Sequence, residues 1–125
     1  MKKVLIIEDH PDMLELLGRQ IELMGFEPII ANLGAEGVAK AVSETPDLIM
    51  LDIMMPGMDG REVAKQIRNY PALKDVPIVA ATALFRDSDL KQCIEAGCSS
   101  YIVKPFTFRQ LERKVRQYIP TTRAS

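Results

Sequence analysis

Five short runs rich in apolar residues alternate with segments of helical periodicity along the whole chain. The runs occupy residues 4–7, 28–31, 48–51, 76–81 and 100–103. Most are apolar at successive positions rather than at every second one, which is typical of parallel strands that helices cover on both faces. Helical connections between parallel strands are almost always right-handed crossovers. The alternation therefore predicts a single α/β domain, with a doubly wound, five-stranded parallel sheet and helices on both of its faces.

The segments between the runs carry the signals of helices. Helices are expected over residues 11–24, 35–43, 61–69, 87–96 and 108–118. Pro11 begins the first helix, at a position where the missing N–H of proline costs no hydrogen bond. In the second helix, Val38, Ala41 and Val42 are expected to face the core. Pro28 indicates that the second strand lies at an edge of the sheet, because proline has no N–H to donate.

The composition fits one globular domain and narrows the classes of function. The 125 residues are 47% hydrophobic and 26% charged, and 16 Lys and Arg against 17 Asp and Glu give a net charge of -1. This balance supports neither direct nucleic-acid binding nor attachment to an anionic membrane surface. The apolar stretches are too short for a signal peptide or a membrane span. We therefore expect a cytoplasmic protein without membrane contact.

The chain has two cysteines, Cys93 and Cys98, and one histidine, His10. Their number and spacing match neither a disulfide framework nor a zinc site. We expect two reduced, half-buried thiols rather than a redox pair.

Polar side chains follow four of the predicted strands, at the point where each strand ends. Glu8 and Asp9 follow the first strand, Asp52 the third, Thr82 the fourth and Lys104 the fifth. Ligands of doubly wound sheets bind beyond the carboxyl ends of the strands, so these groups are expected to gather at one edge. Taken singly, each has a plainer interpretation: Asp9 as a helix cap, Thr82 as an ordinary strand residue and Lys104 as a solvated lysine.

Three carboxylates packed together would repel each other unless a cation lay between them. A hard divalent cation with oxygen ligands, most simply Mg²⁺, resolves this repulsion. Lys104 and Thr82 can pair with phosphoryl oxygens, and a carboxylate can act as the nucleophile. The strand-end residues therefore favour phosphoryl-transfer chemistry.

Four motifs resemble those of one known family: IIEDH at residues 6–10, LDIMMPGMDG at 51–60, AATA at 80–83 and YIVKPF at 101–106. Together, in this order and spacing, they resemble the receiver domain of bacterial two-component response regulators, and the single-domain chemotaxis regulators in particular. The resemblance implies a flavodoxin-like strand order 2-1-3-4-5. It also implies a receiver domain over residues 1–119, followed by a short polar tail at 120–125.

The resemblance implies that Asp52 accepts a phosphoryl group from a sensor histidine kinase or a histidine phosphotransfer protein. Glu8, Asp9 and Asp52, with the backbone carbonyl of Met54, are expected to hold the cation, Mg²⁺ or alternatively Mn²⁺. The protein is thus expected to be a phosphoacceptor in signalling rather than an enzyme, with self-catalysed phosphotransfer and slow autodephosphorylation.

The resemblance assigns further roles around this acceptor. Thr82 and Lys104 are expected to be catalytic, Thr82 as a hydroxyl that moves toward the phosphoryl group and Lys104 as its cationic partner. Tyr101 is expected to change rotamer together with Thr82 as a switch. The Lys104–Pro105 peptide bond is expected to be cis.

The expected output surface consists of the fourth helix, the fifth strand and the fifth helix. Its candidate contact residues are Lys91, Gln92, Glu95, Tyr101 and Arg109, although a solvated helix face would have the same composition. The downstream target has no signature in the sequence, and the protein is expected to be a monomer or a phosphorylation-dependent dimer.

Met54 and Leu84 flank the expected site with apolar side chains, which position an attacking water poorly. We therefore expect a long-lived phosphoryl group. Three alternatives remain open from the residues: a phosphate-ester hydrolase, an interaction module that takes no phosphate, and a flavodoxin-like cofactor binder. The hydrolases of this chemistry place their nucleophile after the first strand and need a cap, and no phosphate-binding loop follows the first strand here.

Overall fold

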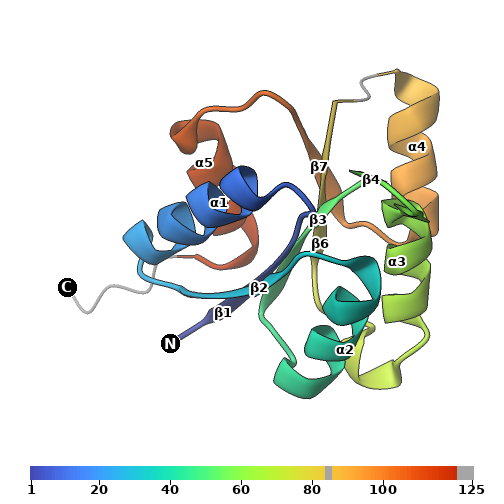
Figure 1. The fold of residues 1–125 in the computed structure, drawn as a ribbon, viewed down its shortest axis with the longest axis horizontal. Coiled ribbons are helices and arrows are strands. Elements are labelled where there is room, and N and C mark those ends of the chain that lie inside the picture. The colour runs from blue at the N-terminus through green and yellow to red at the C-terminus, as the bar shows by residue number, and fades with distance from the viewer. Residues whose placement is uncertain (84–85, 121–125) are drawn as a thin grey trace.

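The computed structural model describes residues 1–83 and 86–120, and five strands in this part of the chain form one parallel sheet (Figure 1). The strands are β1 (Lys3–Ile7), β2 (Glu27–Ala31), β3 (Leu48–Asp52), β6 (Ile78–Thr82) and β7 (Ser100–Val103). Their order is β2-β1-β3-β6-β7, and every neighbouring pair is parallel. The predicted fold class and strand order are therefore confirmed. The prediction that the Pro28 strand lies at an edge is also confirmed, because β2 pairs with β1 alone.

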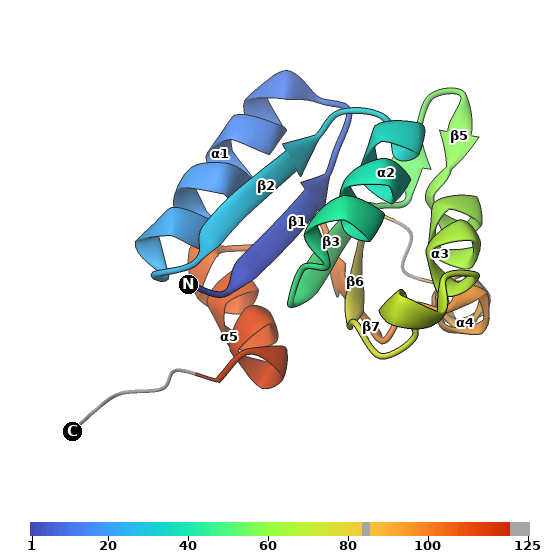
Figure 2. The ribbon, with the colours of Figure 1, turned by 90° about the horizontal axis from the view of Figure 1, so that it is seen from below.

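Helices cover both faces of this sheet (Figures 1 and 2). They are α1 (Pro11–Leu23), α2 (Gly34–Glu44), α3 (Gly60–Arg68), α4 (Asp87–Ala96) and α5 (Phe108–Tyr118), with a short 3₁₀ helix η1 (Pro71–Leu73) after α3. Helices α1 and α5 lie on one face, and α2, α3 and α4 lie on the other. None of the helices in residues 1–83 and 86–120 has both the length and the apolar character that crossing a bilayer requires.

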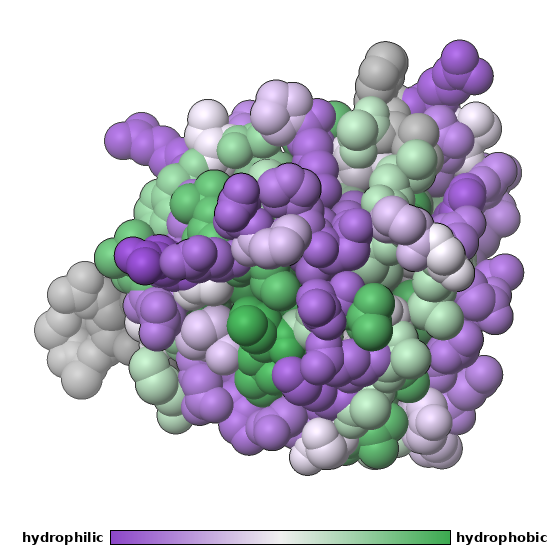
Figure 3. Space-filling view, viewed as in Figure 1, coloured by the Kyte–Doolittle hydropathy of each residue, from purple (hydrophilic) through white to green (hydrophobic). Residues whose placement is uncertain are grey.

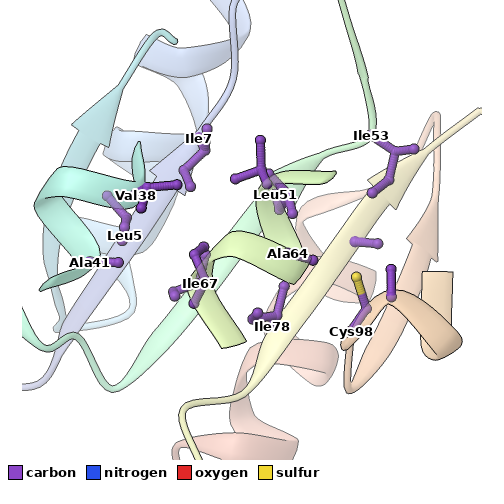
Figure 4. Close-up of a cluster of buried hydrophobic side chains, with 14 of the residues drawn as sticks. Leu5, Ile7, Val38, Ala41, Leu51, Ile53, Ala64, Ile67, Ile78 and Cys98 are labelled. Atoms are coloured by element: carbon purple, nitrogen blue, oxygen red, sulfur yellow. The ribbon is translucent and has the colours of Figure 1, made fainter. Parts of the chain in front are cut away.

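The core consists of two apolar clusters, one on each face of the sheet. Leu5 and Ile7 point toward α2 and α3 in the cluster that Figure 4 shows, whereas Val4 and Ile6 belong to the cluster under α1 and α5. All four side chains are buried. Successive strand residues point to opposite faces, so a strand covered on both sides is apolar at every position. Polar chemistry is therefore confined to the strand ends, because a charge inside either cluster would be costly to bury.

One prediction about the helices is wrong in detail, and one alternative interpretation, Asp9 as a helix cap, is excluded. Val42 is 44% exposed rather than inward, because it lies at the margin of the helix face that Val38 and Ala41 present to the core. The first helix is capped by His10, whose side chain accepts the Met13 N–H at 3.4 Å, and not by a carboxylate.

Both cysteines are free, but the prediction of half-buried thiols is wrong. Cys93 and Cys98 are buried in the cluster under α2, α3 and α4. Burial raises the pKa of the Cys98 thiol to about 12 and also raises the pKa of Cys93. The thiols act as small apolar groups of the core.

A short antiparallel hairpin follows β3 and is absent from the sequence prediction. Its strands are β4 (Met54–Met55) and β5 (Met58–Asp59), in which Met54 pairs with Asp59 and Met55 with Met58. Gly57 in the connecting turn has a φ of 77°, a conformation that glycine adopts without strain.

Most of the molecular face in Figure 3 is hydrophilic, and apolar side chains reach it in patches.

Candidate functional site

A cavity of about 530 Å³ lies over the carboxyl ends of β1 and β3. Acidic and basic side chains line its floor, and apolar side chains from α1 and from the β4–β5 hairpin line its rim. The lining residues are Glu8, Asp9, His10, Asp12, Met13, Leu16, Asp52, Met54, Pro56 and Lys104. The cavity therefore occupies the place where a doubly wound sheet binds its ligand.

The strand register brings the acidic residues together. Ile7, the last residue of β1, pairs with Leu51, so Glu8, the residue after β1, lies next to Asp52, the last residue of β3. Carboxylate oxygens of Glu8, Asp9 and Asp52 lie within 4.8 Å of one another. Glu8 and Asp52 are 2% and 4% exposed, and Asp9 is half-buried. Crowded, largely buried oxygen ligands of this kind fit a hard divalent cation such as Mg²⁺.

Lys104 neutralises part of this acidic cluster. Its Nζ lies 3.1 Å from Glu8 Oε1 and 3.2 Å from Asp52 Oδ1. Burial disfavours the charged ammonium, but the Asp52 charge and the hydrogen bond to Glu8 outweigh it and raise the pKa of Lys104. The Lys104 backbone N–H donates to the carbonyl of Thr82 at 2.8 Å, which fixes the lysine at the end of β6. The ammonium is thus held against the carboxylates of Glu8 and Asp52.

The two buried carboxyl groups differ in their affinity for a proton. Burial raises the pKa of Asp52 to about 6, and its hydrogen bond with Glu8 acts in the same direction against the charge of Lys104. Burial also acts on Glu8, but hydrogen bonds with Asp52, the His10 N–H and Lys104 outweigh it and lower the pKa of Glu8. Glu8 is therefore the carboxylate that stays ionised, and Asp52 gains most when a cation replaces its proton.

The other predicted site residues lie around this cluster. Thr82 is fully buried at the end of β6, and Tyr101 on the neighbouring strand β7 is 36% exposed. The Met54 side chain is 59% exposed at the rim, and its N–H donates to Asp52 Oδ1 at 3.2 Å. The Lys104–Pro105 peptide bond is cis. Leu84, the second predicted apolar neighbour, lies outside the described residues.

The predicted output residues are all exposed, but they lie on two sides of the molecule. Lys91, Gln92 and Glu95 are on α4, and Arg109 is on α5, which covers the opposite face of the sheet (Figure 1). Tyr101 lies between them on the edge strand β7. A partner that touches all five residues must therefore wrap around this edge of the sheet.

Sequence reasoning missed two features of the site. The His10 N–H donates to Glu8 Oε2 at 3.2 Å and so helps to hold that carboxylate. Gly60 lies so close to the end of β3 that an added Cβ would be 2.5 Å from the carbonyl oxygen of Asp52 and 2.6 Å from Ile53 Cα. The glycine could have been flagged as a close-contact position because it follows a turn and begins a helix, but its neighbour is known only from the fold.

The fold and this site define a class of protein. The chain belongs to the response regulator receiver domain family, whose family model matches residues 4–116. Receiver domains are signalling domains of two-component systems.

Known members of the family match nearly the whole of this chain. The transcriptional regulatory protein PhoP for alkaline phosphatase synthesis, from Bacillus subtilis, is 37% identical over 115 residues, which cover 92% of this chain and 47% of that protein. The chain spans about half the length of the transcriptional regulators that it matches.

Solved structures agree with the fold in detail. The chemotaxis protein CheY4 of Vibrio cholerae superposes with a TM-score of 0.91 at 28% identity, covering 94% of this chain and 98% of that one. The receiver domain of the sensor histidine kinase PA1611 from Pseudomonas aeruginosa, solved with a magnesium ion coordinated in the active site cleft, superposes with a TM-score of 0.87. It is 28% identical, and the match covers 96% of this chain and 98% of that one.

Proposed function

We propose that this receiver domain accepts a phosphoryl group on Asp52 from a sensor histidine kinase or a histidine phosphotransfer protein. The observation that carries the proposal is the cluster of Glu8, Asp9 and Asp52 oxygens within 4.8 Å, with the Lys104 ammonium 3.2 Å from Asp52. A buried carboxylate that lies among other carboxylates and beside a lysine ammonium can act as a phosphoryl acceptor. A purely structural strand end needs none of these groups.

The transfer step is a displacement at phosphorus. An oxygen of Asp52 attacks the phosphorus, the P–N bond to the donor histidine breaks, and the imidazole keeps the electron pair and takes up a proton from solvent. Lys104 pairs with a phosphoryl oxygen, and the Thr82 hydroxyl donates to another. Thr82 ends β6, the neighbour of β3, and Lys104 follows β7 with its Nζ already 3.2 Å from Asp52 Oδ1, so each can reach the new group with little backbone movement.

The acidic cluster is proposed to hold Mg²⁺ through Glu8, Asp9, Asp52 and the backbone carbonyl of Met54, and Mn²⁺ would suit the same ligands. The magnesium in the similar PA1611 receiver domain supports this choice. When bound, the cation neutralises charge that develops on the phosphoryl oxygens. Glu8, with its lowered pKa, supplies a carboxylate that is ionised across the neutral range.

The phosphoryl group is proposed to act as a switch. It adds about two negative charges at neutral pH, which draw Lys104 and Thr82 toward it. Thr82 is fully buried, so its movement leaves a space that Tyr101, on the adjacent strand, can turn inward to fill. The surface of α4, β7 and α5 then changes shape for a downstream partner, with phosphorylation biasing two states that already exist.

The same proposal covers the domain bounds, the cellular location, the oligomeric state and the lifetime of the phosphoryl group. We propose a cytoplasmic receiver domain over residues 1–119, with a short polar tail at 120–125, that is a monomer or dimerises on phosphorylation. The domain itself neither binds nucleic acid nor enters a membrane. It is proposed to be a phosphoacceptor rather than a turnover enzyme, with slow autodephosphorylation because the exposed Met54 thioether cannot orient an attacking water.

The proposal is tested with acetyl phosphate as the donor, in Mg²⁺, followed by intact-mass measurement. We expect at most one added phosphoryl group per chain, no addition without a divalent cation, and no addition in Asp52→Asn. Asp75→Asn is the matched control, since Asp75 is an exposed aspartate outside the cavity. A labelled Asp52→Asn variant would contradict the proposal, and repeated turnover of a generic phosphate ester would favour a hydrolase instead.

A further inference from the structure

Arg61 lies in the first turn of α3, between the hairpin that follows Asp52 and helix α4. Its Nε donates to both carboxylate oxygens of Asp59 at 3.1 Å, and its Nη2 donates to Asp59 Oδ2 at 2.8 Å. The Arg61 backbone N–H donates to Asp59 Oδ1 at 2.9 Å. These hydrogen bonds lower the pKa of Asp59, so the pair stays ionised at neutral pH. The carboxylate is therefore held from two directions by one residue.

Asp59 shares the β4–β5 hairpin with the backbone that is proposed to bind the cation. Met54 pairs directly with Asp59 across this hairpin. The next residue, Gly60, donates its N–H to the carbonyl of Ile53 at 3.0 Å, which ties the start of α3 to the same segment. A change in the position of Asp59 therefore changes the position of the Met54 backbone.

The far end of the same guanidinium reaches α4. Arg61 Nη1 donates to Oε1 of Gln92, in the middle of that helix. One side chain thus contacts both the hairpin beside the acidic cluster and a helix of the expected output surface. Both contacts are at the surface, where an arginine is free to exchange one acceptor for another at little cost.

A second arginine of α3 holds the C-terminal end of α4 in a different way. Arg68 Nε donates at 2.9 Å to the carbonyl of Gly97, the C-cap of α4, and its Nη1 donates to two further backbone carbonyls at 2.7 Å each. These acceptors belong to the backbone and the contacts are partly buried. The buried residues of α4, Cys93 and Ala96, lie in the same half of the helix. The C-terminal end of α4 is therefore anchored more firmly than the turn that contacts Arg61.

We propose that Arg61 is a positioning residue for the metal and phosphoryl site, and that its contact with Gln92 couples the β4–β5 hairpin to α4, which pivots about Gly97. This inference rests on the proposed function. The Met54 carbonyl would hold the cation, so the hairpin would be fixed when the cation is bound, and Asp59, paired with Met54, would set the position of the Arg61 guanidinium. Arg61 then changes its contact with Gln92, while Arg68 keeps the end of the helix in place.

The positioning role is tested by titrating Mg²⁺ into the ¹⁵N-labelled protein and following its amide signals by NMR. We expect Arg61→Ala to weaken Mg²⁺ binding about threefold to tenfold, which is less than the roughly tenfold to hundredfold typical of a residue that supports a metal ligand, because the Arg61–Asp59 pair is partly exposed. Loss of a nearby positive charge alone would strengthen binding instead, so the sign separates the two explanations. Arg113→Ala, which removes an exposed arginine on α5, is the matched control. Unchanged or tighter binding by Arg61→Ala would overturn the positioning role.

The coupling to α4 is tested in the same titration with Gln92→Ala. We expect this variant to bind Mg²⁺ within about twofold of the parent protein, because Gln92 lies outside the cavity. The Mg²⁺-induced shifts of the α4 amides should fall by about half or more, while those of residues 53–59 persist. Gln92→Glu keeps an acceptor for Arg61 and should retain the α4 shifts. A full α4 response in Gln92→Ala would overturn the coupling.

This result is separable from the proposed function. Acetyl phosphate labelling of the parent protein and of Asp52→Asn reports on the acceptor role and not on the contact between Arg61 and Gln92. A parent protein that labels, but whose α4 response is the same in Gln92→Ala, would refute the Arg61 coupling and leave the acceptor role intact. A parent protein that shows the Arg61-dependent response to Mg²⁺ but takes no phosphoryl group would refute the acceptor role and leave the Arg61 coupling intact.

Discussion

At the scale of single residues, Asp52 combines burial with charge. Its carboxyl is 4% exposed and lies beside Glu8, and burial raises its pKa to about 6. A group with a raised pKa stabilises the fold fully below its unfolded pKa, and this contribution is lost as the pH rises through the folded value. For Asp52 the loss falls between the ordinary aspartate pKa of 3.8 and the folded pKa of about 6.

Asp52→Asn should therefore stabilise the cation-free protein at pH 8, by about 1 to 3 kcal/mol, because a buried charge is replaced by a neutral group of the same shape. The gain should be small at pH 4, where Asp52 is already protonated. Urea unfolding of both proteins at the two pH values, in EDTA, measures the difference. A variant less stable than the parent protein at pH 8 would mean that Lys104 stabilises the carboxylate more than burial destabilises it.

Met54 is proposed to limit the attack of water on a phosphoryl group at Asp52. Its side chain is 59% exposed at the rim of the cavity and has no group that could orient a water molecule for attack on the phosphoryl group. Met54→Asn supplies such a group and should shorten the lifetime of the phosphorylated protein several-fold. Phosphate release from both proteins, labelled to the same extent, measures this. Equal rates, or slower release from the variant, would contradict the role of Met54.

The cysteine thiols should be nearly inert in the folded protein. Burial raises the pKa of Cys98 to about 12, and that of Cys93 is also raised, so little thiolate forms at pH 8. A disulfide reagent such as DTNB should react with the folded protein roughly a hundredfold more slowly than with the protein in urea, since the thiolate is the reacting species. Fast reaction of either thiol under native conditions would show that α4 opens readily.

At the scale of secondary structure, the close contact between α3 and the end of β3 positions the site. Gly60 begins α3 directly against the backbone of Asp52 and Ile53, and the β4–β5 hairpin is the segment that connects them along the chain. The contact is backbone to backbone, so it cannot relax by a change of rotamer. Strand β3 and helix α3 are therefore expected to move as one unit.

Gly60→Ala should destabilise the protein by about 2 to 4 kcal/mol, since its Cβ would be 2.5 Å from the Asp52 carbonyl oxygen. Gly18→Ala is the matched control inside α1, where the nearest atom to the new Cβ is 3.9 Å away. That substitution should stabilise the helix by about 0.5 to 1 kcal/mol. Urea unfolding compares the two variants, and equal effects would mean that the approach of α3 to β3 is looser than the structure indicates.

At the scale of the whole molecule, the sequence was enough to predict the sheet and the edge at which polar groups meet. The apolar runs that become β1 and β3 leave Glu8 and Asp52 as the first polar residues beyond the core, and the parallel fold brings them side by side. Both conclusions need only the periodicity of the strands and the direction of the connections.

The remaining features depend on tertiary contacts that no local sequence pattern indicates. The two-residue strands of the β4–β5 hairpin are too short to show a periodicity, and Arg61 meets Gln92 only after α3 and α4 have packed. Histidine is an unusual helix cap, so the role of His10 at α1 was missed. Val42 was misplaced because the edge of a helix face depends on how far the neighbouring elements reach.

The most direct test of the central claim is to locate the phosphoryl group chemically. The protein is labelled with acetyl phosphate in Mg²⁺, reduced with borohydride to convert an acyl phosphate into homoserine, digested and sequenced by mass spectrometry. We predict homoserine at position 52, dependent on the divalent cation, with Glu8 and Asp9 unmodified. Homoserine at another aspartate, or no reduction product from a labelled protein, would contradict the claim that Asp52 is the acceptor of this acidic cluster.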